Sequence, residues 1–191
     1  MYDFPLIAVT DAASCPRSLT EQLLRLSHAP IPPAAIILRA KQLNNTEYYA
    51  LALQAQKICT KLKLPLILHS NWQLSRKLGI DKLHLPLALL HTLPEAEKKH
   101  LCWLSTSVHS LEEAQQAQAL GASVLIAGHI YATQCKPGLA ARGLNFLQSV
   151  CAASSLPVYA IGGIGFNAKQ HTELQKSGAY GACIMSAYMK V

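Results

Sequence analysis

Short apolar runs alternate with longer amphipathic stretches along almost the whole chain. Each run is about 4 to 6 residues long and is bounded by Gly, Pro, Ser, Asn or Asp, as β-strands require. The pattern predicts eight strands: Leu6–Thr10, Ala35–Arg39, Leu64–His69, Lys82–Leu85, Cys102–Ser105, Ser123–Ala127, Val158–Ile161 and Gly181–Met185.

The intervening stretches carry apolar residues at a spacing of about 3.6, which is typical of amphipathic helices. Ser18–Glu21 has the form of a capping box, and Gly121 and Gly178 follow two of the stretches as helix-ending glycines do. The pattern predicts helices after Ser18 and over Asn45–Lys63, Trp72–Leu78, Pro94–His100, Ser110–Leu120, Asn145–Ala153 and Asn167–Ser177.

Eight successive strand–helix units favour a (β/α)₈ TIM barrel. The alternative is an open, doubly wound sheet, which is less favoured because no nucleotide-binding fingerprint accompanies the units. We expect a single domain over residues 1–191. Little chain follows the eighth strand, so the last helix is expected to be truncated or absent. A second copy of the chain, in a homodimer, would then cover that strand.

The composition narrows the class of ligand. The chain is 51% hydrophobic and carries a net charge of +7, but its basic residues are scattered and the longest basic run is Lys98-Lys99. We therefore expect a small anionic ligand and no nucleic-acid partner. The six cysteines form no paired spacing, and no apolar run reaches membrane-spanning length. These features indicate a cytoplasmic protein without disulfides or a membrane partner.

Reactive side chains of barrels gather at the carboxyl ends of the strands. His129 follows the sixth apolar run directly and is the candidate acid/base, because imidazole titrates near neutral pH. Gly162 and Gly163 end the seventh run, where the phosphate site of many barrels lies, and Met185 and Ser186 follow the eighth.

The remaining candidates are cations, hydroxyls and an imidazole that would contact substrate: Arg39, Lys41, His69, Ser105, Thr133 and Lys136. The whole set is short of carboxylates, so it predicts no magnesium site. His69, His84 and His109 match no zinc spacing, and we expect neither a metal nor a cofactor.

Taken together, these motifs resemble the thiamine-phosphate synthase/TenI superfamily of (β/α)₈ barrels over nearly the whole chain. The resemblance is carried by Ala8–Asp11, Ile37–Lys41, Ser105, His109–Ala114, Gly121-Ala122, the loop His129–Gly138, Ala141–Leu144, Pro157–Ile164 and Ile184–Ser186.

Within that superfamily the chain looks most like the thiazole tautomerase (TenI) branch. Synthases of the family hold magnesium pyrophosphate with two aspartates, and the corresponding positions here are Ser70 and Leu89. His129 stands where synthases usually have Pro and tautomerases have His. Cys135-Lys136 with the later Ala141–Gly143 also resembles the tautomerase branch.

The resemblance implies isomerisation of a carboxythiazole phosphate to its aromatic tautomer in thiamine biosynthesis, with a small phosphorylated thiazole as substrate. Two alternatives stay open. One is a working thiamine-phosphate synthase, which condenses a pyrimidine pyrophosphate with thiazole phosphate. The other is a non-catalytic barrel that binds a thiamine precursor or a partner protein.

Overall fold

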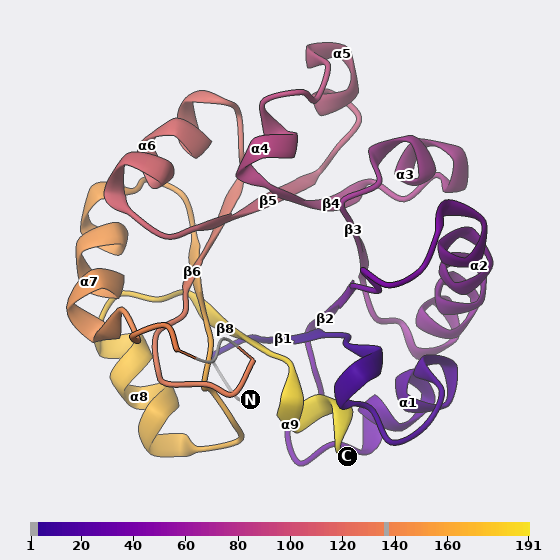
Figure 1. The fold of residues 1–191 in the computed structure, drawn as a ribbon, viewed down its shortest axis with the longest axis horizontal. Coiled ribbons are helices and arrows are strands. Elements are labelled where there is room, and N and C mark those ends of the chain that lie inside the picture. Colours follow the sequence, from indigo (N-terminus) through magenta and orange to yellow (C-terminus); the bar gives the residue numbers. More distant parts are fainter. Residues whose placement is uncertain (1–3, 136–137) are drawn as a thin grey trace.

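A computed structural model describes residues 4–135 and 138–191, and its eight parallel strands close into one barrel in sequence order, each paired with the next and β8 with β1 (Figure 1). The strands are β1 Leu6–Val9, β2 Ala35–Leu38, β3 Leu66–His69, β4 Lys82–Pro86, β5 Trp103–Val108, β6 Val124–Gly128, β7 Val158–Ile161 and β8 Gly181–Ile184. The predicted TIM barrel is confirmed.

Helices surround the strands as an outer ring (Figure 1). Between β1 and β4 lie η1 Ala12–Ser14, α1 Leu19–Arg25, η2 Leu26–His28, α2 Asn45–Leu62 and α3 Trp72–Leu78. After β4 come α4 Leu87–Leu90, α5 Glu95–Lys98, α6 Leu111–Ala119, α7 Gly143–Ala153, α8 Ala168–Lys176 and α9 Ser186–Met189. None of the described helices is long and apolar enough to cross a membrane.

Most predicted elements lie within two residues of their observed bounds, and β5 and α4 are the clearest differences from the sequence prediction. Strand β5 continues to Val108, beyond the expected end at Ser105, because Ser105 and Ser107 are polar residues that face the barrel interior and pair with β6. Helix α4 was not expected, and it begins directly after Pro86, the last residue of β4. Alternation along β5 thus continues through serines that a hydrophobicity pattern reads as loop.

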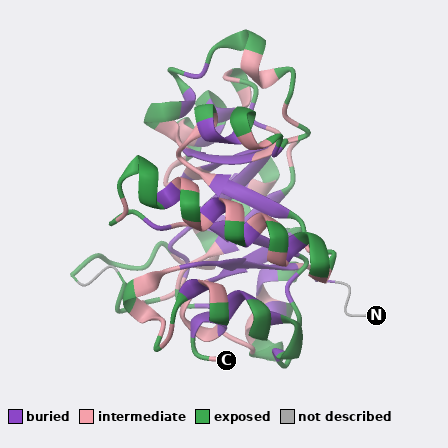
Figure 2. Ribbon diagram, turned by 90° about the vertical axis from the view of Figure 1, so that its right-hand side faces the viewer, coloured by how far each residue is buried: buried purple, intermediate pink, exposed green. Residues whose placement is uncertain are grey.

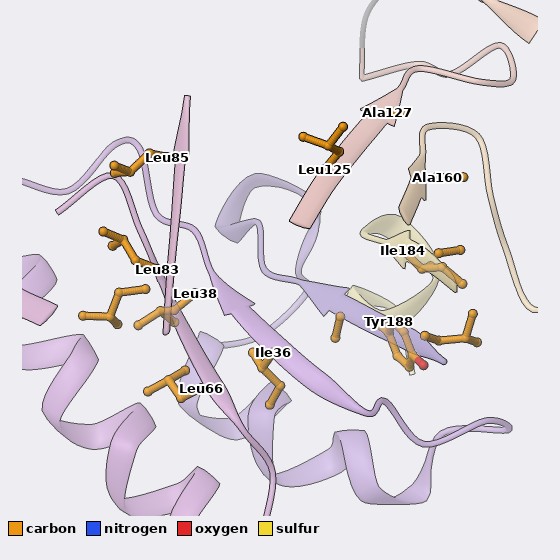
Figure 3. Packing of buried hydrophobic residues seen from close by; sticks show 14 of the residues in the cluster. Ile36, Leu38, Leu66, Leu83, Leu85, Leu125, Ala127, Ala160, Ile184 and Tyr188 are labelled. Carbon is orange, nitrogen blue, oxygen red and sulfur yellow. The ribbon is translucent and has the colours of Figure 1, made fainter. Parts of the chain in front are cut away.

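The strands alternate between two hydrophobic layers. One layer fills the space between strands and helices and includes Ile36, Leu38, Leu66, Leu83 and Ile184 (Figure 3). The other lies inside the barrel and is formed by Ile7, Val9, Ala35, Ile37, Ile67, Val124, Ile126, Tyr159 and Cys183. The strands are buried, whereas the helices expose their outer faces (Figure 2).

The short helix α9 stands between α8 and α1 in the ring (Figure 1), and all four residues of β8 are buried within the single chain. Tyr188 of α9 is fully buried, and its hydroxyl donates to the Ile31 carbonyl at 2.9 Å. The Gln22 amide of α1 donates to the Tyr188 carbonyl at 2.6 Å, and Phe166 packs edge-on against the Tyr188 ring. The last helix is short, spanning Ser186–Met189, and the expected homodimer stays a prediction.

Candidate functional site

A cavity of about 640 Å³ opens at the carboxyl ends of the strands. Its wall brings together residues from all eight strands and the segments that follow them, including Arg39, Lys41, His69, His84, Ser107, His109, His129, Thr133, Cys135, Gly162, Gly163, Met185 and Ser186. A more open groove of about 840 Å³ is lined by residues such as Pro5, Cys151, Pro157 and Tyr180. That groove has no histidine, cation or carboxylate among its described lining residues, so we place the candidate site in the first cavity.

His129 lines the cavity and is only 5% exposed. Its Nε2 lies 3.3 Å from the Leu139 carbonyl oxygen, so the loop after β6 folds back over the imidazole. The backbone is held from the same loop, because Arg142 N–H donates to the His129 carbonyl at 2.9 Å and Arg142 Nε donates to the Gly128 carbonyl at 3.1 Å. The ring is thus fixed at the cavity wall with one nitrogen engaged.

Two further imidazoles sit side by side inside the barrel. The rings of His69 on β3 and His84 on β4 have centroids 5.2 Å apart. His84 Nδ1 lies 3.0 Å from Ser105 Oγ and its Nε2 3.2 Å from Ser107 Oγ, while His69 Nδ1 lies 2.6 Å from Ser70 Oγ. Strands β3 to β5 therefore present a connected set of hydroxyls and imidazoles to the interior.

Burial keeps both of these rings neutral. Burial and then the positive charges of Arg39 and Lys41 lower the pKa of His69 to about 4. Burial, followed by the charges of His69 and Lys41, lowers the pKa of His84 to about 3. At neutral pH the pair therefore offers hydrogen-bonding atoms without adding positive charge.

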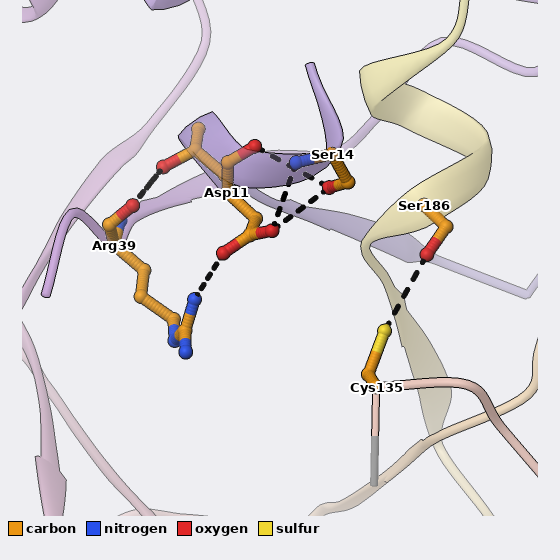
Figure 4. A network of polar contacts seen from close by, with 6 residues as sticks. Asp11, Ser14, Arg39, Cys135 and Ser186 are labelled. Atoms are coloured by element: carbon orange, nitrogen blue, oxygen red, sulfur yellow. Dashed lines mark hydrogen bonds and ion pairs between the residues drawn. The ribbon is translucent and has the colours of Figure 1, made fainter. Parts of the chain in front are cut away.

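Arg39, which follows β2, brings a cation to the cavity wall. Figure 4 shows the contacts that hold it. Its guanidinium pairs with the Asp11 carboxylate at 2.6 Å, and its backbone N–H donates to Thr10 Oγ1 at 2.8 Å. The same carboxylate accepts from the Ser14 hydroxyl at 2.9 Å and, as the N-cap of η1, from the Ser14 backbone N–H at 3.2 Å. Asp11 thus orients Arg39 toward the cavity from the end of β1, while Lys41 reaches the same wall.

In the wall formed after β7 and β8, the backbone after β7 packs closely against the backbone after β6. Gly162 and Gly163 have φ of +103° and +68°, and a Cβ at either position would overlap the chain at His129 or at Tyr131 and Ala132. Cys135 Sγ of the β6 loop lies 3.7 Å from Ser186 Oγ at the start of α9 (Figure 4). The loop that carries Thr133 therefore reaches across to the wall formed by Gly162, Gly163 and Ser186.

Most of the residues that the sequence predicts for the site lie in the wall of this cavity. Every described candidate lines the cavity except Ser105, which is fully buried and contacts His84 instead. Lys136 lies outside the described residues. The sequence places His84 and Ser107 among the polar residues at strand ends and gives His84 and His109 structural or substrate-contact roles, but none of the three is among the main site candidates. The available signal is the alternation along the strands: His84 pairs with Ser105 across β4 and β5, and Ser107 follows two residues later on the same face of β5.

The cavity does not fit a magnesium–pyrophosphate complex of the kind that the sequence resemblance associates with synthases. No described residue of its lining is Asp or Glu, and no group of three His, Cys, Asp or Glu side chains among the described residues is arranged to hold a metal. Ser70 contacts His69, and Leu89 lies on α4 with 40% of its surface exposed. Hard divalent cations need oxygen ligands that carry charge, which these two positions lack.

Fold and site together define a (β/α)₈ barrel whose cavity is rich in imidazoles and cations and opens at the carboxyl ends of the strands. Residues 6–188 match the family described as thiamine monophosphate synthase. The chain belongs to this family.

The named relatives that the chain resembles carry names of the same family. The chain is 30% identical to thiamine-phosphate synthase of Syntrophomonas wolfei over 98% of its own length and 89% of the relative's. It is 34% identical to thiamine-phosphate synthase of Desulfitobacterium hafniense strain Y51 over 80% and 73%. The solved structure of thiamine phosphate pyrophosphorylase from Pyrococcus furiosus superposes with a TM-score of 0.81 at 25% identity, covering 99% of this chain and 89% of that one.

Proposed function

We propose that this family member is a thiazole tautomerase-like isomerase, which converts a carboxythiazole phosphate to its aromatic form by proton transfer. The observation that carries the proposal is the chemistry of the cavity wall: its described lining residues supply imidazoles, hydroxyls and cations, and none of them is Asp or Glu. Such a wall suits an anionic substrate whose protons are moved and whose bonds to phosphate are left intact.

The reaction removes a proton from the ring carbon beside the carboxylate and adds one at the exocyclic carbon. The electron pair of the broken C–H bond enters the ring, and the exocyclic double bond becomes single as its carbon is protonated. His129 is the proposed acid/base, since it lines the cavity with Nε2 fixed by the Leu139 carbonyl. Arg39 and Lys41 would offset the negative charge that develops on the ring and carboxylate.

The phosphate of the substrate is proposed to lie against Gly162, Gly163, Met185 and Ser186. The positive φ values of the two glycines bring the backbone close to the cavity, and Ser186 contributes a hydroxyl beside them. Thr133 lies on the facing loop, and Lys136 is proposed to act from the same loop. Binding energy from this remote group would position the ring for proton transfer.

A second candidate is thiamine-phosphate synthase, and the names of the relatives favour it. It predicts that the protein condenses a pyrimidine pyrophosphate with thiazole phosphate in the presence of magnesium. The lack of Asp and Glu among the lining residues that the structure describes argues against it, because release of pyrophosphate needs neutralisation of developing charge. A third candidate, a non-catalytic barrel, predicts binding of thiazole phosphates without turnover.

One pair of assays separates the three. Purified protein is supplied either with the non-aromatic carboxythiazole phosphate tautomer or with pyrimidine pyrophosphate plus thiazole phosphate, each with magnesium and with a chelator. Magnesium-independent aromatisation supports the tautomerase, and thiamine phosphate formed only with magnesium supports the synthase. Binding of thiazole phosphate with neither product would leave the non-catalytic reading and overturn our proposal.

A further inference from the structure

A second histidine, His109, lines the cavity that His129 lines. Val108, the last residue of β5, pairs with Ala127 of β6, so His109 and His129 follow the ends of neighbouring strands. Adjacent strands are about 4.8 Å apart. Both histidines line the same cavity.

Glu113 holds the His109 ring. Its Oε2 accepts from His109 N–H at 2.6 Å and lies 2.9 Å from His109 Nδ1. Glu113 is fixed in turn by the start of α6, where its own N–H donates to the N-capping Ser110 hydroxyl at 3.1 Å. The carboxylate therefore orients the imidazole through two contacts, and His109 Nε2 keeps no hydrogen-bond partner among the described residues.

This arrangement is the His–carboxylate pair by which many enzymes fix an imidazole for proton transfer. Helix capping alone explains the contact of Glu113 with the His109 backbone, but not its contact with Nδ1. His84 and His69, by comparison, are neutral and engaged with hydroxyls. His109 is thus the cavity histidine with a carboxylate partner.

We propose that His109 is a second catalytic residue and that Glu113 is its positioning residue, which rests on the tautomerase function proposed above. In this two-group reaction His129 takes the proton from the ring carbon. His109 Nε2 delivers a proton to the exocyclic carbon as the electron pair moves through the ring. His129 then releases its proton to water at the cavity mouth, and His109 takes one up, so no proton is lost or gained.

Kinetics of four variants test the assignment. Replacement His109→Gln is expected to lower kcat about 100-fold, the effect of losing a general acid, with KM changed about two-fold or less. Glu113→Gln is expected to lower kcat about ten-fold. The matched controls are His91→Gln and Glu112→Gln, whose side chains are exposed and outside the cavity lining. Both controls are expected to keep wild-type kcat.

Chemical rescue separates catalysis from structure. Imidazole added to His109→Ala is expected to restore part of kcat, and it should restore nothing to His129→Asn, whose replacement side chain fills the site. Wild-type protein gives an independent readout that needs no substitution. Substrate deuterated at the ring carbon should lose its deuterium to solvent, and the exocyclic carbon of the product should carry none.

Three outcomes overturn the proposal. If His109→Gln keeps the kcat of His91→Gln while His129→Asn is inactive, the tautomerase stands and the second catalytic group does not. Deuterium carried from the ring to the exocyclic carbon shows one imidazole moving it, with the same consequence. Absence of tautomerase turnover in wild-type protein overturns the function and this proposal together.

Discussion

Gly162 packs directly against His129. A Cβ at position 162 would overlap the Cβ of His129 and would lie 2.7 Å from its Cα. The φ of +103° at Gly162 is also one that residues other than glycine rarely adopt. The end of β7 therefore sets the position of the residue that follows β6. The candidate phosphate wall and the candidate acid/base are one packed unit.

Replacement Gly162→Ala is therefore expected to move His129 and to strain the turn. We expect the free energy of unfolding to fall by about 1–3 kcal/mol and kcat to fall at least about ten-fold. Urea denaturation and the tautomerase assay measure the two effects. Gly165→Ala is the control for stability, because its φ is ordinary and a Cβ there meets no atom within 4 Å. Equal stability of the two variants would contradict the packing argument.

Replacement His129→Asn tests the acid/base directly. We expect kcat to fall about 100-fold or more, since asparagine cannot accept and return a proton, while phosphate affinity changes little. Steady-state kinetics and calorimetric titration with inorganic phosphate give the two numbers. Turnover at the wild-type rate would exclude His129 from the chemistry.

Acid sensitivity is expected from the buried imidazoles. Folding lowers the pKa of His84 from 6.5 to about 3 and that of His69 from 6.5 to about 4. Between each lowered pKa and 6.5, the unfolded chain therefore binds a proton at that histidine that the folded chain does not bind. The stability that the neutral rings contribute is complete above pH 6.5 and is lost as the pH falls below it. Each imidazole contributes a slope of about 1.4 kcal/mol per pH unit in this window.

Replacement His84→Gln should remove about one imidazole's share of that slope. Urea denaturation of both proteins at several pH values between 4.5 and 7.5 measures it, and the comparison of slopes does not depend on the absolute stability of the variant. His100→Gln, at an exposed position, serves as the control. A wild-type slope in the His84 variant would show that this ring is not held neutral by burial.

Helix α9 is expected to stabilise the barrel through Tyr188. Tyr188→Phe loses the hydrogen bond to the Ile31 carbonyl and should cost about 1 kcal/mol, whereas Tyr188→Ala should cost about 3–5 kcal/mol because the ring is fully buried. Tyr180→Phe, at a side chain that is 59% exposed, should cost almost nothing. Thermal unfolding measures all three, and a stable Tyr188→Ala variant would mean that the packing of α9 through Tyr188 does not stabilise the barrel.

The fold was predictable because apolar runs and capping signals are local. Strand β7 and helix α3 begin and end where the pattern predicts. The true end of β5 was not predictable from hydrophobicity, since Ser107 faces a polar interior. The contact of His129 with Leu139 depends on how a loop folds back, and the contact of Glu113 with His109 depends on side-chain direction. Neither contact can be predicted from the local sequence pattern.

The barrel lining is unequal around its circumference. Aliphatic side chains such as Val9, Ile37 and Ile126 line one part of the cavity, while His69, His84 and Ser107 of β3 to β5 line the other. The heterocycle of the proposed substrate would therefore meet apolar side chains on one side and hydrogen-bonding groups on the other. The lining would thus select one orientation of the substrate before any proton moves. That orientation would decide which substrate atoms lose and gain a proton.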